Sequence, residues 1–177
     1  SKFPDALYSI WETRILNEFM VHQPRANFII LKGEKYSDES FFNYLVEEYP
    51  TRVFLSPDIN IMDRYVVHQE STILITRLIS QTTFMKFENI NYTYLETILI
   101  DLLLDDSYLY VYQGHELINI FENTSRYYQI NEKRLLRYAR RRSAIPQLIN
   151  FIKDKPDIDL PFIREILKPQ NEEIKSY

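Results

Sequence analysis

A dense run of basic side chains between residues 126 and 142 is the part of this chain best suited to bind another molecule. Glu132 is the only acid in the run. Asn131 can cap the start of a helix that contains most of these basic residues. Guanidinium groups bind phosphate and carboxylate groups through paired hydrogen bonds. We therefore take the following residues as candidate contacts to DNA or another polyanion: Lys133, Arg134, Arg137, Arg140, Arg141 and Arg142.

The preceding stretch, residues 87–125, carries the opposite charge. It has no Lys or Arg, and its acids are Glu88, Glu96, Asp101, Asp105, Asp106, Glu116 and Glu122. Neighbouring faces of opposite charge can attract one another within a protein, and cations at a helix C-terminus also complement the helix macrodipole. The basic run therefore has two interpretations. Its charges either pair within the protein or stay solvated, or they form a site for a polyanion.

The centre of the acidic stretch predicts a strongly apolar helix over residues 93–106. Thr93 and Glu96 have the spacing of a capping box. Asp101 and Asp105 share a helical face, whereas Glu96 and Asp101 differ by roughly 140°. We expect a helix buried on most sides, with an acidic ridge that faces solvent or a partner. Its apolar residues are Leu95, Ile98, Leu99, Ile100, Leu102, Leu103 and Leu104.

The segments around this helix predict the other elements. Before it, apolar spacing predicts helices at residues 10–21 and 37–49 and strands at 28–31, 53–55, 65–67 and 72–76. After it, we expect a short β piece at 108–112 and helices at 116–127, from 131 onward, at 145–152 and at 161–167. The spacing favours parallel pairing of the first two strands and a hairpin of the last two.

These elements predict an α/β fold, with a small mixed β-sheet of about four strands flanked by helices and followed by a helical C-terminal part. We expect a single domain over residues 8–167 and a polar, mobile tail over residues 168–177.

The composition excludes several kinds of site. Gly33 and Gly114 alone cannot form a glycine-rich phosphate loop, and the three histidines have no metal-ligand spacing. The chain has no cysteine, which excludes thiolate chemistry and fits a reducing cytoplasm. No apolar run approaches the roughly 20 residues needed to cross a bilayer. We expect a cytoplasmic protein with no catalytic residue, bound metal or cofactor and no membrane contact.

The alternative from a different class is a metal-dependent nuclease. Asp58 follows a predicted strand. In one group of nucleases an Asp at such a position binds the metal ion together with a Glu-x-Lys on the next strand. The expected second half is missing, because the strand at 72–76 continues as Arg77 and Leu78. Asp58 is therefore interpreted as part of a Pro-Asp turn.

A series of short motifs along residues 8–152 resembles one bacterial family. In order they are IWET at 10–13, LNEFMVHQP at 16–24, FII at 28–30, EK at 34–35, FLSP at 54–57, LIS at 78–80, LETILID at 95–101, YQG at 112–114 and LRYARRR at 136–142. This ordered set is similar to the AbiEi-like antitoxins of bacterial abortive-infection and type IV toxin-antitoxin systems, whose neighbouring genes encode a nucleotidyltransferase toxin.

The resemblance implies a non-enzymatic antitoxin and transcriptional regulator that acts in phage defence. Its implied partners are DNA and the cognate nucleotidyltransferase-like toxin. Some members have been likened to degenerate restriction-endonuclease-like folds, which agrees with the incomplete nuclease site. Two features depart from the family pattern. Thr97 stands where the family has a lysine, and no winged-helix pattern precedes Trp11, so operator binding is not assigned to these residues.

Overall fold

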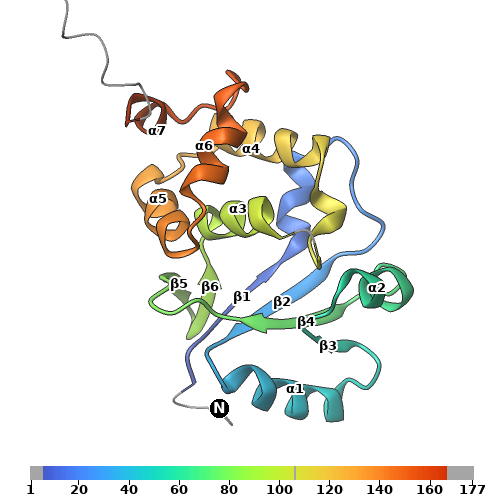
Figure 1. Ribbon diagram of the computed structural model, residues 1–177. Coiled ribbons are helices and arrows are strands. Elements are labelled where there is room, and N and C mark those ends of the chain that lie inside the picture. The colour runs from blue at the N-terminus through green and yellow to red at the C-terminus, as the bar shows by residue number, and fades with distance from the viewer. Residues whose placement is uncertain (1–5, 106, 167–177) are drawn as a thin grey trace, which may run out of the picture.

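The structure, a computed structural model, describes residues 6–105 and 107–166 as a mixed α/β fold (Figure 1). One sheet has the strand order β3-β4-β2-β1-β6-β5. The strands are β1 Tyr8–Glu12, β2 Phe28–Gly33, β3 Val53–Leu55, β4 Thr72–Arg77, β5 Phe84–Phe87 and β6 Ile90–Thr93. The predicted mixed sheet with flanking helices and a helical C-terminal part is confirmed, but the sheet has six strands instead of about four.

The helices surround this sheet on two sides. The α-helices are α1 Ser37–Glu48, α2 Ile59–Ile61, α3 Leu95–Leu104, α4 His115–Tyr127, α5 Glu132–Arg141, α6 Ile145–Lys153 and α7 Pro161–Ile166. In addition, η1 Thr13–Phe19 and η3 Tyr110–Tyr112 are 3-10 helices, and η2 Met62–Val66 is a π-helix. None of the described helices is long and apolar enough to cross a membrane. Asp106, the last residue of the predicted helix at 161–167 and the predicted tail at 168–177 lie outside the described residues.

The parallel half of the sheet is built from β2, β3 and β4. Both β2 and β3 pair with β4, in register from Phe28 with Thr72 and from Val53 with Ile73. The first two predicted strands therefore run in the same direction, but the prediction that they pair with each other is wrong, because β4 lies between them. β1 is antiparallel to β2 and parallel to β6, which makes the sheet mixed.

The predicted helix at residues 10–21 is only partly correct, because just residues 13–19 are helical. Its first part is strand β1, in which buried Ser9 and Trp11 alternate with half-buried residues, and the next part is η1. Apolar residues at 10, 11, 15, 16 and 19 fit a helix, yet β1 is paired on both sides by β2 and β6. These ladder hydrogen bonds outweigh local propensity.

Two further strand predictions are wrong. Residues 65–67 lie in and just after the π-helix η2, so the predicted hairpin with β4 does not form. Residues 110–112 of the predicted β piece form the 3-10 helix η3. The hairpin that does form joins β5 and β6 through Glu88 and Asn89, whose φ angles are 45° and 64°. Two positive φ angles are typical of a type I′ turn, here without glycine.

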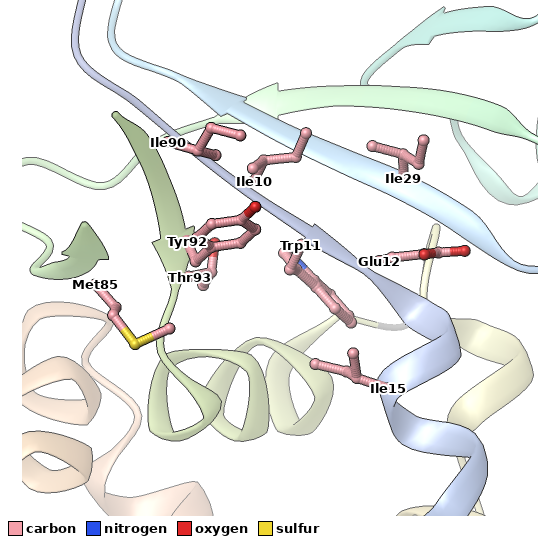
Figure 2. Close-up of a pocket in the computed structure, with 9 residues that line it drawn as sticks. All are labelled: Ile10, Trp11, Glu12, Ile15, Ile29, Met85, Ile90, Tyr92 and Thr93. Carbon is pink, nitrogen blue, oxygen red and sulfur yellow. The ribbon is translucent and has the colours of Figure 1, made fainter. Parts of the chain in front are cut away.

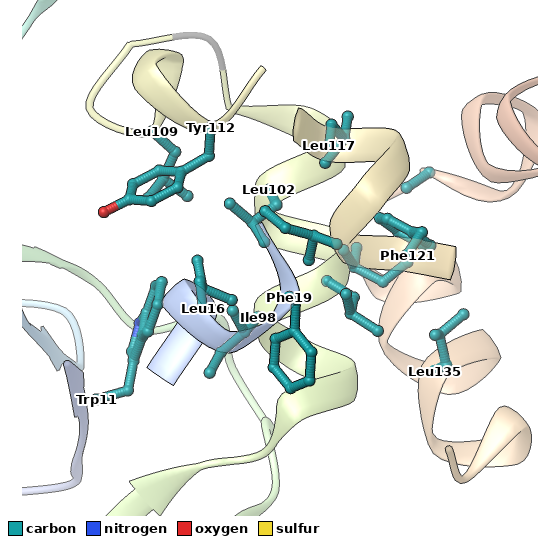
Figure 3. Packing of buried hydrophobic residues seen from close by; sticks show 14 of the residues in the cluster. Trp11, Leu16, Phe19, Ile98, Leu102, Leu109, Tyr112, Leu117, Phe121 and Leu135 are labelled. Carbon is teal, nitrogen blue, oxygen red and sulfur yellow. The ribbon is translucent and has the colours of Figure 1, made fainter. Parts of the chain in front are cut away.

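Helix α3 lies at the centre of the fold, between the sheet and helices α4, α5 and α6 (Figure 1). Figure 3 shows its residues Ile98 and Leu102 packed among side chains from the sheet and from neighbouring helices, including Trp11, Phe19 and Phe121. The predicted buried helix is confirmed. The predicted capping box is wrong, because the Thr93 hydroxyl donates to Ser9 Oγ (3.0 Å) and Glu96 binds α5.

Helix α1 covers the opposite side of the sheet, but only over one half of it. Its Phe41 packs with Val53 and Ile75 in a second apolar cluster. The helix makes most of its strand contacts with β2, β3 and β4, and its Phe41 ring also packs edge-on against Tyr8 of β1. The turn into α1 is tight, since a Cβ on Gly33 would lie 2.9 Å from the Asp38 backbone nitrogen and 2.9 Å from the Phe41 ring.

Replacing Gly33 by alanine should therefore lower the free energy of unfolding by about 1–3 kcal/mol, because the added methyl group overpacks the junction of β2 and α1. Urea denaturation measures the change. Gln147→Ala, on the exposed side of α6, is the matched control and should change stability by less than about 0.5 kcal/mol. Equal stability of the two variants would contradict the close approach at Gly33.

Candidate nucleic-acid interface

Helix α5 carries the predicted basic residues. Its start is capped as predicted, since the Asn131 side chain accepts a hydrogen bond from the Arg134 backbone N–H at 3.0 Å. Leu135, Tyr138 and Ala139 form its buried face, which packs on α3 and α6. The basic residues must therefore lie on the sides and outer face of α5.

The structure divides the six predicted site residues into two groups. Lys133, Arg137, Arg140 and Arg141 are exposed. Arg134 and Arg142 are only partly exposed, and each forms an ion pair with an acid of α3. The exposed residues follow the spacing i, i+4, i+7 and i+8, which places them along one face of the helix. We call these four residues the basic face.

Glu96 fixes the start of α5. Its carboxylate, in a residue that is 5% exposed, accepts hydrogen bonds from Arg134 Nη1 at 3.1 Å and from the Asn131 backbone N–H at 2.8 Å. The Arg134 guanidinium also lies over the Tyr94 ring, 3.6 Å from its centroid, a favourable cation–π geometry. This arginine is therefore held within the protein.

Asp101 fixes the other end of α5. Its Oδ1 accepts hydrogen bonds from the Tyr138 hydroxyl and from Arg142 Nη1, both at 2.9 Å, while its Oδ2 pairs with the Lys32 ammonium. Asp101 and Lys32 are 1% and 2% exposed. Burial, together with the negative charge of Asp101, raises the pKa of Tyr138, so this tyrosine stays a proton donor.

The prediction that the acidic ridge of α3 faces solvent or a partner is therefore wrong for Glu96 and Asp101. Arg134 of α5 and Arg142 at its C-terminal cap lie eight residues apart. The long side chain of Arg134 reaches Glu96, and that of Arg142 reaches Asp101. Asp105 instead stabilises the turn after α3, where its Oδ1 accepts from the Ser107 N–H and hydroxyl.

The basic face borders the segment that follows β4. Arg141 Nη1 donates to the Ser80 carbonyl oxygen at 2.9 Å, which ties the C-terminal end of α5 to the sheet. Arg137, Arg141, Gln81 and Thr83 line a small cleft between the two segments. Guanidinium and hydroxyl groups in one cleft suit a phosphate oxygen.

A second concave surface has a different chemistry. This open groove has a volume of about 480 Å³, and most of the residues lining it are apolar or aromatic. Figure 2 shows their side chains. Ile10, Tyr92 and Met85 lie on one face of the sheet because they are in register, and this is the half that α1 leaves uncovered. Glu12 is the charged residue of the lining. The groove therefore does not suit a polyanion.

Asp58, the residue that suggested a nuclease, lies at the start of α2. Its Oδ1 accepts a hydrogen bond from the Ile61 backbone N–H at 2.9 Å, so it acts as a helix cap. Within residues 6–105 and 107–166, no cluster of three or more His, Asp or Glu residues could hold a metal ion.

The fold and the basic face define a mixed α/β protein with a candidate surface for polyanions. The sequence profile of DUF6577, a family of unknown function, matches residues 1–157. The chain belongs to this family. No curated protein and no solved structure matches the chain.

Asp101 should be the most sensitive position of the α3–α5 contact. Asp101→Asn leaves the Lys32 and Arg142 charges without a counter-ion, and we expect a loss of about 3–5 kcal/mol in the free energy of unfolding. Lys32→Met should cost less, because the Asp101 carboxylate keeps Arg142 and Tyr138. Urea denaturation compares the two. A smaller loss for Asp101→Asn than for Lys32→Met would contradict the central role of this carboxylate.

Proposed function

We propose that this protein is a non-enzymatic regulatory module that binds nucleic acid through the basic face of α5. The observation that carries the proposal is the division of the basic residues. Arg134 and Arg142 are used internally, whereas Lys133, Arg137, Arg140 and Arg141 project from the same helix into solvent. Four cations along one face of a fixed helix suit the phosphates of a nucleic acid backbone.

The internal contacts of α5 favour binding by this face. Glu96 and Asp101 anchor the two ends of the helix, and Arg141 is tied to Ser80. Because the helix is already ordered before a ligand binds, binding costs less conformational entropy than it would on a flexible segment.

We further propose that the module is an antitoxin and transcriptional regulator of a bacterial abortive-infection system, paired with a nucleotidyltransferase-like toxin and acting in the cytoplasm. This proposal depends on the resemblance to AbiEi-like antitoxins. It is supported by the position of two motifs of that resemblance, residues 95–101 and 136–142, which meet where Asp101 accepts hydrogen bonds from Tyr138 and Arg142.

A salt titration tests the nucleic-acid contact. Binding of the promoter upstream of its own gene should weaken with salt, and Arg137→Ala/Arg141→Ala should reduce the slope of log K against log salt by about 1.8, the value for two lost duplex phosphate contacts. Fluorescence anisotropy at several salt concentrations measures the slope. The matched control is Arg25→Ala/Arg52→Ala, which removes two exposed arginines that precede β2 and β3 in the chain and do not belong to α5. Equal slopes for all three proteins would remove the basic face from the site.

Co-expression tests the antitoxin role. The chain should restore growth to bacteria that express a nucleotidyltransferase-like toxin encoded beside its gene, and Asp101→Asn should restore less because it destabilises the fold. Growth curves together with immunoblots of both proteins measure the effect. Failure of the folded wild-type chain to restore growth would contradict the antitoxin role.

The nuclease alternative predicts instead that purified protein cleaves plasmid with Mg²⁺ or Mn²⁺ and that Asp58→Ala abolishes cleavage.

A further inference from the structure

An open pocket of about 590 Å³ lies at the N-terminal end of α5, directly beside the basic face. It is formed by the segment between α4 and α5, the first turn of α5 and the start of α7, with Glu96 at its edge. Its volume is in the range of small-molecule and cofactor sites. The lining residues are Glu96, Gln129, Ile130, Asn131, Glu132, Lys133, Arg134 and Phe162.

An aromatic ring provides one wall of this pocket. Phe162, the second residue of α7, is 38% exposed, although the next residue, Ile163, is fully buried. The Lys133 ammonium lies 5.8 Å from the centroid of the Phe162 ring. An exposed ring beside a cation is the combination on which single-stranded nucleic acids stack their bases.

The two acids of the pocket are engaged in internal contacts. Glu132 accepts hydrogen bonds from the backbone N–H groups of Phe162 and Ile163, at 3.2 Å and 2.7 Å, and so caps α7. Glu96 is bound by Arg134 and by the Asn131 backbone. Their negative charge is therefore partly compensated within the protein.

Two amide groups of the pocket are available to a ligand. Gln129 is exposed, and its side chain makes no hydrogen bond to another described residue. Asn131 uses its oxygen to cap α5, and within the described part of the chain its side-chain nitrogen has no acceptor. Gln129 can therefore offer both a donor and an acceptor to the edge of a nucleobase, and Asn131 can add a donor.

We propose that this pocket accepts one unpaired nucleobase, stacked on Phe162 and hydrogen-bonded to Gln129 and Asn131, while the neighbouring phosphates follow the basic face. The inference rests on the proposed function and narrows its ligand to nucleic acid that is single-stranded at this point. A base inside a duplex is stacked and paired, and it would first have to be extruded at a cost of a few kcal/mol.

Lys133 connects the pocket to the rest of the site, because it lines the pocket and also begins the basic face. From Lys133 to Arg141 the helix rises by about 12 Å. This length covers the phosphates of only a few nucleotides, so a short oligonucleotide should contain the whole binding unit.

Three fluorescent probes that differ in their bases test the inference. We compare an eight-nucleotide thymidine strand, an abasic strand with the same number of phosphates and a duplex of the same length, by anisotropy at one salt concentration. The wild-type protein should bind the thymidine strand about 5- to 150-fold more tightly than the abasic strand, which is the range expected for stacking of one base. A uridine RNA strand identifies which sugar the site prefers.

Variants of the pocket assign this preference to its residues. Phe162→Ala should abolish the preference for bases and leave the salt dependence unchanged, whereas Phe162→Trp should keep the preference. Thermal unfolding checks that these variants fold. Gln129→Ala provides a second variant at an exposed position and should reduce the preference by a smaller factor.

The outcomes separate the two proposals. Salt-dependent binding of the thymidine and abasic strands with equal affinity would overturn the base pocket and leave the basic face in place. A preference for bases that survives Phe162→Ala and Gln129→Ala would also overturn it, because the base would then bind elsewhere. Absence of binding to all four probes and to promoter DNA would overturn the proposed function together with this inference.

Discussion

The buried carboxylate of Asp101 is the interaction on which the arrangement of this protein depends. It lies where β2, α3 and α5 meet, and it receives hydrogen bonds from Lys32, Tyr138 and Arg142, one from the strand and two from α5 and its C-terminal cap. A charged group in such a site needs ion-pair and hydrogen-bond partners to compensate for its lost hydration. The contact therefore specifies one position of α5 relative to α3 and the sheet.

This constraint also explains how one helix can be both structural and available for binding. Arg142 and Arg134 compensate buried acids, and they do so from positions at opposite ends of the basic face. The acids of α3 thus hold the helix without lying beneath Arg137 and Arg140, which remain exposed. Binding surfaces on rigid elements lose little entropy when a ligand is bound.

Most of the fold could be predicted from local patterns, because apolar periodicity indicates α1, α3, α4 and α5 and the buried strands β2 and β4, and the Asn131 cap marks the start of α5. The edge of the sheet could not. Strands β5 and β6 have four residues each, β5 is mostly exposed and β6 mostly half-buried, and the turn between them has no glycine to mark it. Their pairing is stabilised by β1, whose own strand character depends on neighbours that are distant in the sequence.

The sequence by itself determined that an acidic apolar helix is followed by a basic helix, since composition, spacing and the Asn131 cap are all local. Only the tertiary structure decided which arginines are free. The pairs of Glu96 with Arg134 and of Asp101 with Arg142 join residues 38 and 41 positions apart. Periodicity gives the faces of each helix, but it contains no information on how two helices rotate and approach each other. The same reason explains why Lys32, which flanks a predicted strand, was not predicted to be the buried partner of Asp101.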